Sequence, residues 1–161
     1  MESNNTDLGV YLKDHYAGGI GAIELLEHLS KSHENESLKH FFSELLAEVK
    51  IDHETLSRLM RALEVDDSSI RNAGAWIAEK IGRAKLGPSA NNKDSLRDLQ
   101  ALETLFMGVT GKILLWGALK TLNGKHPSMD QFDFAGLENR AIKQLESIET
   151  KRLELARTIF A

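Results

Sequence analysis

Residues 96–122 read LRDLQALETLFMGVTGKILLWGALKTL, and this stretch decides the fold. At about 100° per residue, its apolar side chains cover more than half of a helix circumference. These side chains are Leu96, Leu99, Leu102, Leu105, Phe106, Val109, Ile113, Leu114, Leu115, Trp116 and Leu119. A helix that is apolar on so many sides needs other helices around it, so we expect the rest of the chain to pack against this one.

The bulk composition is that of one folded domain spanning residues 1–161. Hydrophobic residues make up 42% of the chain and charged residues 27%, a balance typical of globular proteins rather than disordered ones. The net charge is −4, and the lysines and arginines are scattered, so no basic face for nucleic acid is predicted. The chain has no cysteine, which excludes disulfides, thiolate metal sites and cysteine nucleophiles.

The first residues and the hydropathy pattern bear on location. The start of the chain, Met1–Asn5, is polar and acidic and lacks the pattern of a signal peptide. No uninterrupted apolar run approaches the roughly 18 residues of a membrane span. We therefore expect a cytoplasmic protein of bacterial type that does not contact a membrane.

Hydrophobic periodicity predicts four long helices and one shorter helix. The first long helix is expected to begin near Thr6 as its N-cap, and polar turns or Gly-Pro sequences separate the helices. The predicted ranges are 6–32, 37–63, 69–85, 96–122 and 134–160.

The lengths of the connections predict how these helices are arranged. The turn at residues 33–36 is short, so the first two helices should form an antiparallel hairpin. The segment 69–85 is long enough to carry the chain back along the second helix. We therefore expect a four-helix bundle with an additional crossover helix between its second and third helices, which would be parallel. The alternative is an up-and-down arrangement of five antiparallel helices.

A first pair of polar residues lies on faces that should be buried. Glu103 and Arg152 lie almost equally far along the chain from Ser128, the centre of the last turn, so they should meet at the same height. Glu149, three residues before Arg152, can reach the same guanidinium. The sequence therefore predicts a buried ionic pair, Glu103 with Arg152, assisted by Glu149.

The first hairpin contains a second candidate pair. Around a turn centred near Asn35, His15 and Asp52 differ in height by less than one helical turn, and Asp52 falls within the apolar stripe of its helix. A carboxylate beside an imidazole can fix its tautomer or raise its pKa, as a general base requires. His15 and Asp52 are therefore predicted to form a second buried pair.

Two interpretations of these five residues remain open. The polar groups can be satisfied core pairs that only fix the helix register, because a buried charge is tolerated when it has a partner. Alternatively they can line a pocket in which Arg152 binds a small acidic ligand, since a guanidinium suits carboxylates and phosphates. No nucleophile accompanies them, so an enzyme is the less favoured reading.

The order and lengths of the helices resemble those of the ferritin-like superfamily. That resemblance implies a bundle whose members bind two metals through a carboxylate from each of two helices and a Glu-x-x-His motif from each of the other two. The motif is missing here, because Lys50 precedes His53 by three positions and residues 134–160 contain no histidine. Of the positions that the family uses, only Glu103 carries a suitable ligand on the inward face. We therefore expect a ferritin-like bundle without a metal centre or cofactor.

Two short segments also resemble those of bacterial proteins that carry no assigned activity. They are Tyr11-Leu-Lys-Asp-His15 and Gly108-Val-Thr-Gly-Lys112. This likeness implies no reaction and no ligand.

Two classes of function follow. The first is a non-catalytic binding or interaction module, expected to be a homodimer or to bind another protein, because the apolar arc of residues 96–122 is so wide. The second is a divergent ferritin-like metal-carboxylate protein, or a ligand-binding or enzymatic bundle, that uses Glu103 with Arg152 and His15 with Asp52. The first class is favoured.

Overall fold

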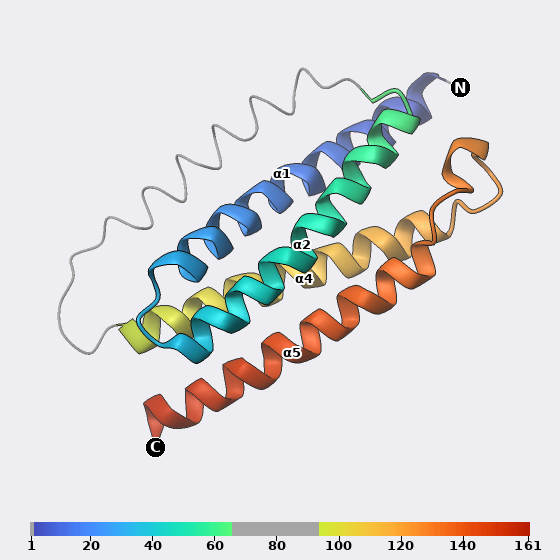
Figure 1. The fold of residues 1–161 in the computed structure, drawn as a ribbon. Coiled ribbons are helices and arrows are strands. Elements are labelled where there is room, and N and C mark those ends of the chain that lie inside the picture. Colours follow the sequence, from blue (N-terminus) through green and yellow to red (C-terminus); the bar gives the residue numbers. More distant parts are fainter. Residues whose placement is uncertain (1, 66–93) are drawn as a thin grey trace. The chain divides into compact units, whose positions relative to one another are not determined.

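Four long α-helices make up most of the computed structural model, which describes residues 2–65 and 94–161 (Figure 1). No strand occurs in these two ranges, so the prediction of an all-α chain is confirmed. The helices are α1 (Glu2–Ser32), α2 (Glu36–Ala62), α4 (Asp94–Lys120) and α5 (Phe134–Phe160), and a short 3-10 helix, η1 (Pro127–Met129), precedes the last one.

Helices α1 and α2 form the predicted antiparallel hairpin. A three-residue turn separates them, and Asn35 caps α2 by accepting a hydrogen bond through Oδ1 from the backbone N–H of Leu38, at 3.1 Å. Helix α1 begins at Glu2, four residues earlier than predicted, so Thr6 lies within the helix and the predicted N-cap is wrong. No glycine or proline interrupts residues 2–6, and the helix continues through them.

The C-terminus of α2 has an unusual residue. Glu64 takes a positive φ of 54°, and the N–H of Val65 donates to the carbonyl of Met60 at 3.0 Å. This 6→1 hydrogen bond closes a Schellman motif, in which glycine normally occupies the left-handed position. The side chain of Val65 then lies next to Gly9 of α1, where a Cβ would be 3.8 Å from it.

Helices α4 and α5 form the second hairpin. Helix α5 has the predicted bounds, whereas α4 begins and ends two residues before the predicted range. Gly124, with φ of 73°, turns the chain after α4, and Asp133 caps α5 by accepting a hydrogen bond from the N–H of Gly136 at 2.9 Å. The rings of Trp116 and Phe134 are both 1% exposed, and they stack with centroids 6.3 Å apart. Trp116 is therefore a core residue.

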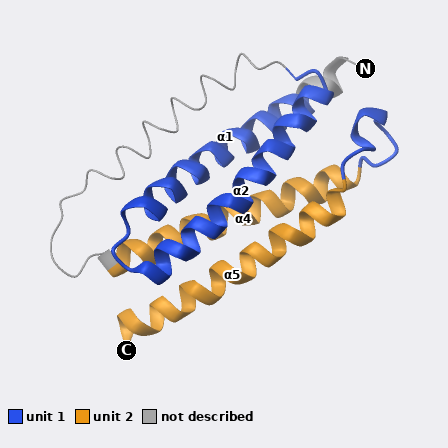
Figure 2. Ribbon diagram, viewed as in Figure 1, with its two compact units in different colours: residues 1–85, 122–132 blue, residues 86–121, 133–161 orange. Residues whose placement is uncertain are grey.

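The described chain divides into two compact units (Figure 2). One contains α1, α2 and the segment 122–132, where the guanidinium of Arg58 lies 5.8 Å above the Phe132 ring. The other contains α4 and α5. The predicted helix at 69–85 lies outside the described residues, so the crossover and the single-domain organisation stay predictions.

Candidate functional site

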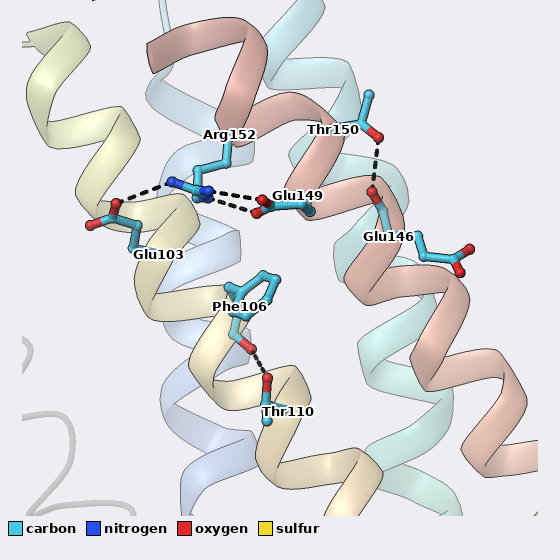
Figure 3. Close-up of polar contacts among 7 residues, drawn as sticks. All are labelled: Glu103, Phe106, Thr110, Glu146, Glu149, Thr150 and Arg152. Carbon is cyan, nitrogen blue, oxygen red and sulfur yellow. Dashed lines mark hydrogen bonds and ion pairs between the residues drawn. The ribbon is translucent and has the colours of Figure 1, made fainter.

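Arg152 of α5 is the centre of an ionic cluster on the second hairpin (Figure 3). Its Nε and Nη2 donate to the two carboxylate oxygens of Glu149, at 2.7 and 2.8 Å. Its Nη1 lies 3.6 Å from Oε1 of Glu103 on α4. The predicted meeting of these three side chains is therefore observed.

The register of the two helices explains why they meet. Glu149 is one turn before Arg152 on α5, which places both side chains on one side of the helix. Two further contacts follow nearly the same antiparallel alignment of the helices as the pair of Glu103 with Arg152. In these contacts Lys112 donates to Gln144, and Lys120 donates to Glu138. The ionic cluster is thus one of several polar contacts between α4 and α5 along the length of the hairpin.

The cluster lies at the surface, which corrects the prediction of a buried pair. The side chains of Glu103, Glu149 and Arg152 are 49%, 36% and 26% exposed. Since apolar residues cover more than half of α4, they cannot all face α5 or a core. Met107, four residues after Glu103 on α4, is itself 66% exposed and shares its outward face.

The contact between Glu149 and Arg152 favours the charged form of both groups. Hydrogen bonds from Arg152 lower the pKa of Glu149, and desolvation opposes this shift. The same hydrogen bonds raise the pKa of Arg152, and Glu103 adds to this rise. A carboxylate held ionised and a guanidinium held protonated cannot exchange protons at neutral pH, so the pair of Glu149 and Arg152 suits recognition rather than acid–base catalysis.

Exposed apolar side chains flank Glu103 along α4. Leu96, Met107 and Leu114 lie seven residues before, four after and eleven after this glutamate, and they are 42%, 66% and 65% exposed. These spacings place all three within about 40° of Glu103 around the helix axis. We call them the α4 stripe.

Helix α5 repeats the arrangement around Glu149. Ile142, Leu153 and Phe160 lie at the same three spacings from that glutamate, and they are 38%, 39% and 70% exposed. We call them the α5 stripe. Because both glutamates contact the same guanidinium, the two stripes flank one ionic cluster. The two stripes and the cluster together are named the α4·α5 face.

Helix α4 also bears on the question of membranes. The segment Ser95–Lys120 is long and apolar enough to cross a membrane by length and composition, although no uninterrupted apolar run of that length exists. A third of its most apolar window is buried. The same composition is found in core helices, so the finding is weak evidence for a membrane span.

The pair of His15 with Asp52 stays a prediction, and the structure places an aromatic ring beside His15. The His15 ring packs edge-on against Tyr11, with centroids 4.6 Å apart. Burial lowers the pKa of His15, and the nearby charge of Asp14 opposes that shift. Asp52 is 2% exposed, which agrees with its expected place in the apolar stripe of α2. A ligand pocket formed by these two residues stays a prediction.

The contact between α1 and α2 involves the next residue on each helix. Nε2 of His53 donates to the carbonyl oxygen of Tyr16 at 3.1 Å, and the two rings lie 4.1 Å apart. One residue along a helix rotates a side chain by about 100°, so Tyr16 and His53 project from their helices in other directions than His15 and Asp52. Burial lowers the pKa of His53, which keeps the imidazole neutral. The glycine at position 19 is the sequence signal that could have revealed this close approach, because a Cβ there would lie 2.5 Å from Cδ2 of His53.

A second polar residue was missed by the sequence reasoning. Gln144 is 2% exposed on α5, and its Oε1 accepts a hydrogen bond from Nζ of Lys112. It lies three residues after Ala141 and four before Ile148, both fully buried. The helical period of those two neighbours is the signal that could have revealed it.

The described side chains give no support for a metal site. Within residues 7–65 and 95–161, no three His, Asp or Glu side chains are grouped so that they could hold an ion. Glu27 forms an ion pair with Lys50 at 2.7 Å. Lys50 itself stands where the motif on α2 would require a carboxylate.

Comparisons with protein-family models, with curated proteins and with solved structures give no match to this chain.

Proposed function

We propose that the chain is a non-catalytic interaction module that binds a protein partner through the α4·α5 face. One observation carries this proposal. Of the eight large apolar side chains that are exposed in the described residues, six lie at matched spacings on this face. Only Val10 and Ile51, on α1 and α2, lie elsewhere.

The grouping is what distinguishes this face from an ordinary surface. Single exposed apolar residues are common on proteins, whereas contiguous apolar patches bordered by polar groups mark binding sites. Covering a side chain such as Leu114 or Phe160 contributes about 25 cal/mol for each Å² of apolar area removed from water. A partner that covers both stripes would therefore gain most of its affinity there.

The ionic cluster favours a protein partner over a lipid bilayer. Glu103, Glu149 and Arg152 lie in the middle of the face, between the apolar residues of each stripe. Ionised groups within a bilayer are unfavourable, whereas a polar group inside a protein interface can be given a partner. We accordingly propose a cytoplasmic location without membrane contact. The partner can be a second copy of the chain, giving the expected homodimer, or a different protein.

We further propose that the two hairpins pack into a ferritin-like bundle without a metal centre, with the segment at 69–85 as its crossover helix. The number and lengths of the described helices support this arrangement.

Sedimentation velocity of the tagged protein in extracts of producing cells tests the proposed function. The wild-type protein should sediment as a complex larger than the 17.9 kDa monomer. The Met107→Glu/Leu153→Glu variant should sediment as a monomer, because it places charge in both stripes. Val10→Glu/Ile51→Glu is the matched control and should retain the complex. A wild-type monomer, or a complex that the face variant retains, would refute the proposal.

A further inference from the structure

We infer that the partner presents an amphipathic helix with a lysine or arginine in the middle of its apolar stripe, placed to bind Glu103. This inference rests on the proposed function and specifies the chemistry of the partner. It depends on the charge balance of the ionic cluster and on the different contacts of its two glutamates.

The two glutamates share the guanidinium unequally. Glu149 receives two short hydrogen bonds from Arg152, which use its Nε and Nη2 donors. Glu103 has an ion pair at 3.6 Å, a distance too long for a hydrogen bond, and is 49% exposed. In the described structure the carboxylate of Glu103 therefore depends mainly on water.

Neighbouring hydroxyl groups are already engaged. Thr110 donates to the carbonyl of Phe106 at 2.8 Å, and Thr150 donates to the carbonyl of Glu146 at 2.9 Å (Figure 3). Neither hydroxyl proton is directed at Glu103. A partner that covers the face would remove water from this carboxylate without a replacement donor from these residues.

An ionised carboxylate loses much stability when it is covered without a hydrogen-bond donor. A lysine or arginine on the partner would replace the lost water and balance the second carboxylate of the cluster. The cluster would then contain two carboxylates and two cations. Charge complementarity therefore selects a basic group at the centre of the partner helix.

The charge balance of the ionic cluster disfavours two other partners, a second copy of the chain and a small acidic ligand. A second copy would bring two further glutamates and one further arginine, leaving four carboxylates with two guanidinium groups. A small acidic ligand would add another negative charge beside Glu103 and Glu149. Glu146, on the outer side of α5 in Figure 3, makes the surroundings still more acidic.

The stripes also define the length of the partner helix. Leu114 lies eighteen residues after Leu96, which is about 27 Å along α4. A helix of about 18 residues can cover that length with apolar side chains near each end and a basic residue near the level of Glu103. Amphipathic helices commonly bind proteins by packing their apolar side against such an apolar groove or face.

Selection from a displayed library of helical peptides of about 18 residues tests the inference on the full-length protein. The selected peptides should share apolar residues near both ends and a central lysine or arginine. Fluorescence anisotropy with a selected peptide should show about tenfold weaker binding to Glu103→Gln, because a charged hydrogen bond is lost. The matched control is Glu48→Gln, a change at an exposed residue of α2, and this variant should bind the peptide as the wild type does.

A charge exchange completes the test. The Glu103→Lys variant should reject the selected peptide and recover binding when glutamate replaces its central basic residue. Selected peptides without a basic residue, or with unchanged affinity for Glu103→Gln, would overturn the inference but keep the proposed interaction face. Sedimentation equilibrium showing a purified homodimer that Met107→Glu disrupts would also overturn it. The absence of any binder sensitive to Met107→Glu would count against both the inference and the proposed function.

Discussion

Glu103 and Glu149 occupy equivalent places on two different helices and contact the same guanidinium, that of Arg152. Each glutamate is surrounded by large exposed apolar residues at the same three spacings. A polar cluster that the sequence suggests as a buried core pair is therefore the centre of an outward-facing surface. This relationship connects the register of the α4·α5 hairpin with its proposed role.

Substitutions at two adjacent glycines of α1 should have opposite effects. A Cβ at Gly19 would lie 2.5 Å from Cδ2 of His53, whereas a Cβ at Gly18 would have nothing within 4 Å. Gly18→Ala should raise the free energy of unfolding by up to about 1 kcal/mol through helix propensity. Gly19→Ala should lower it, because the His53 ring has to move away from Tyr16. Urea unfolding followed by circular dichroism measures both. Equal stabilisation by the two alanines would show that the close contact is absent.

The stability of the protein should fall as the pH decreases from 7.5 to 5.5. Burial lowers the pKa of both His53 and His15 in the folded state, so the unfolded chain binds more protons in this range. The stabilisation is complete above the unfolded imidazole pKa of about 6.5 and is lost as the pH falls towards the folded values. Thermal melts at each pH measure the slope. His53→Gln should reduce it, whereas His126→Gln in an exposed loop should not. A slope that His53→Gln leaves unchanged would contradict this assignment.

Replacing Glu64 by glycine should stabilise the first hairpin. Glu64 has a φ of 54°, a conformation that disfavours residues with a Cβ by about 1 kcal/mol. Glu64→Gly should therefore raise the free energy of unfolding by about that amount, as measured by chemical denaturation. The same change within a helix should have the opposite sign, and Glu48→Gly provides that comparison. Destabilisation by both substitutions would mean that the positive φ is not retained in solution.

The ionic cluster should contribute far less to folding than the core of the same hairpin. Arg152→Met removes an ion pair that is partly exposed to water, and such pairs contribute little to stability. Ile148→Ala removes a fully buried side chain and should cost about 2–5 kcal/mol. Denaturation of both variants gives the comparison. A loss for Arg152→Met as large as that for Ile148→Ala would restore the interpretation of a buried structural pair.

Helical periodicity predicted the helices well, because long amphipathic segments and polar turns give clear signals. The prediction of α5 and of the contacts around Arg152 succeeded because helix register follows from counting residues. Counting residues gives the height of a side chain along the helix but not its rotation about the axis, so the contact of Tyr16 with His53 was not predicted. The prediction that Glu103 is buried was wrong for a related reason. A helix that is apolar on most sides does not reveal which side faces outward.

The most direct test of the proposed interaction face is photo-crosslinking in cells that produce the protein. A benzophenone amino acid is placed singly at each of the six stripe positions and, as controls, at the exposed positions 10 and 51. One discrete crosslinked product, of the same mass, is expected from positions on both stripes and none from the two controls. Crosslinks that are absent from the stripes, or equally strong at positions 10 and 51, would contradict it.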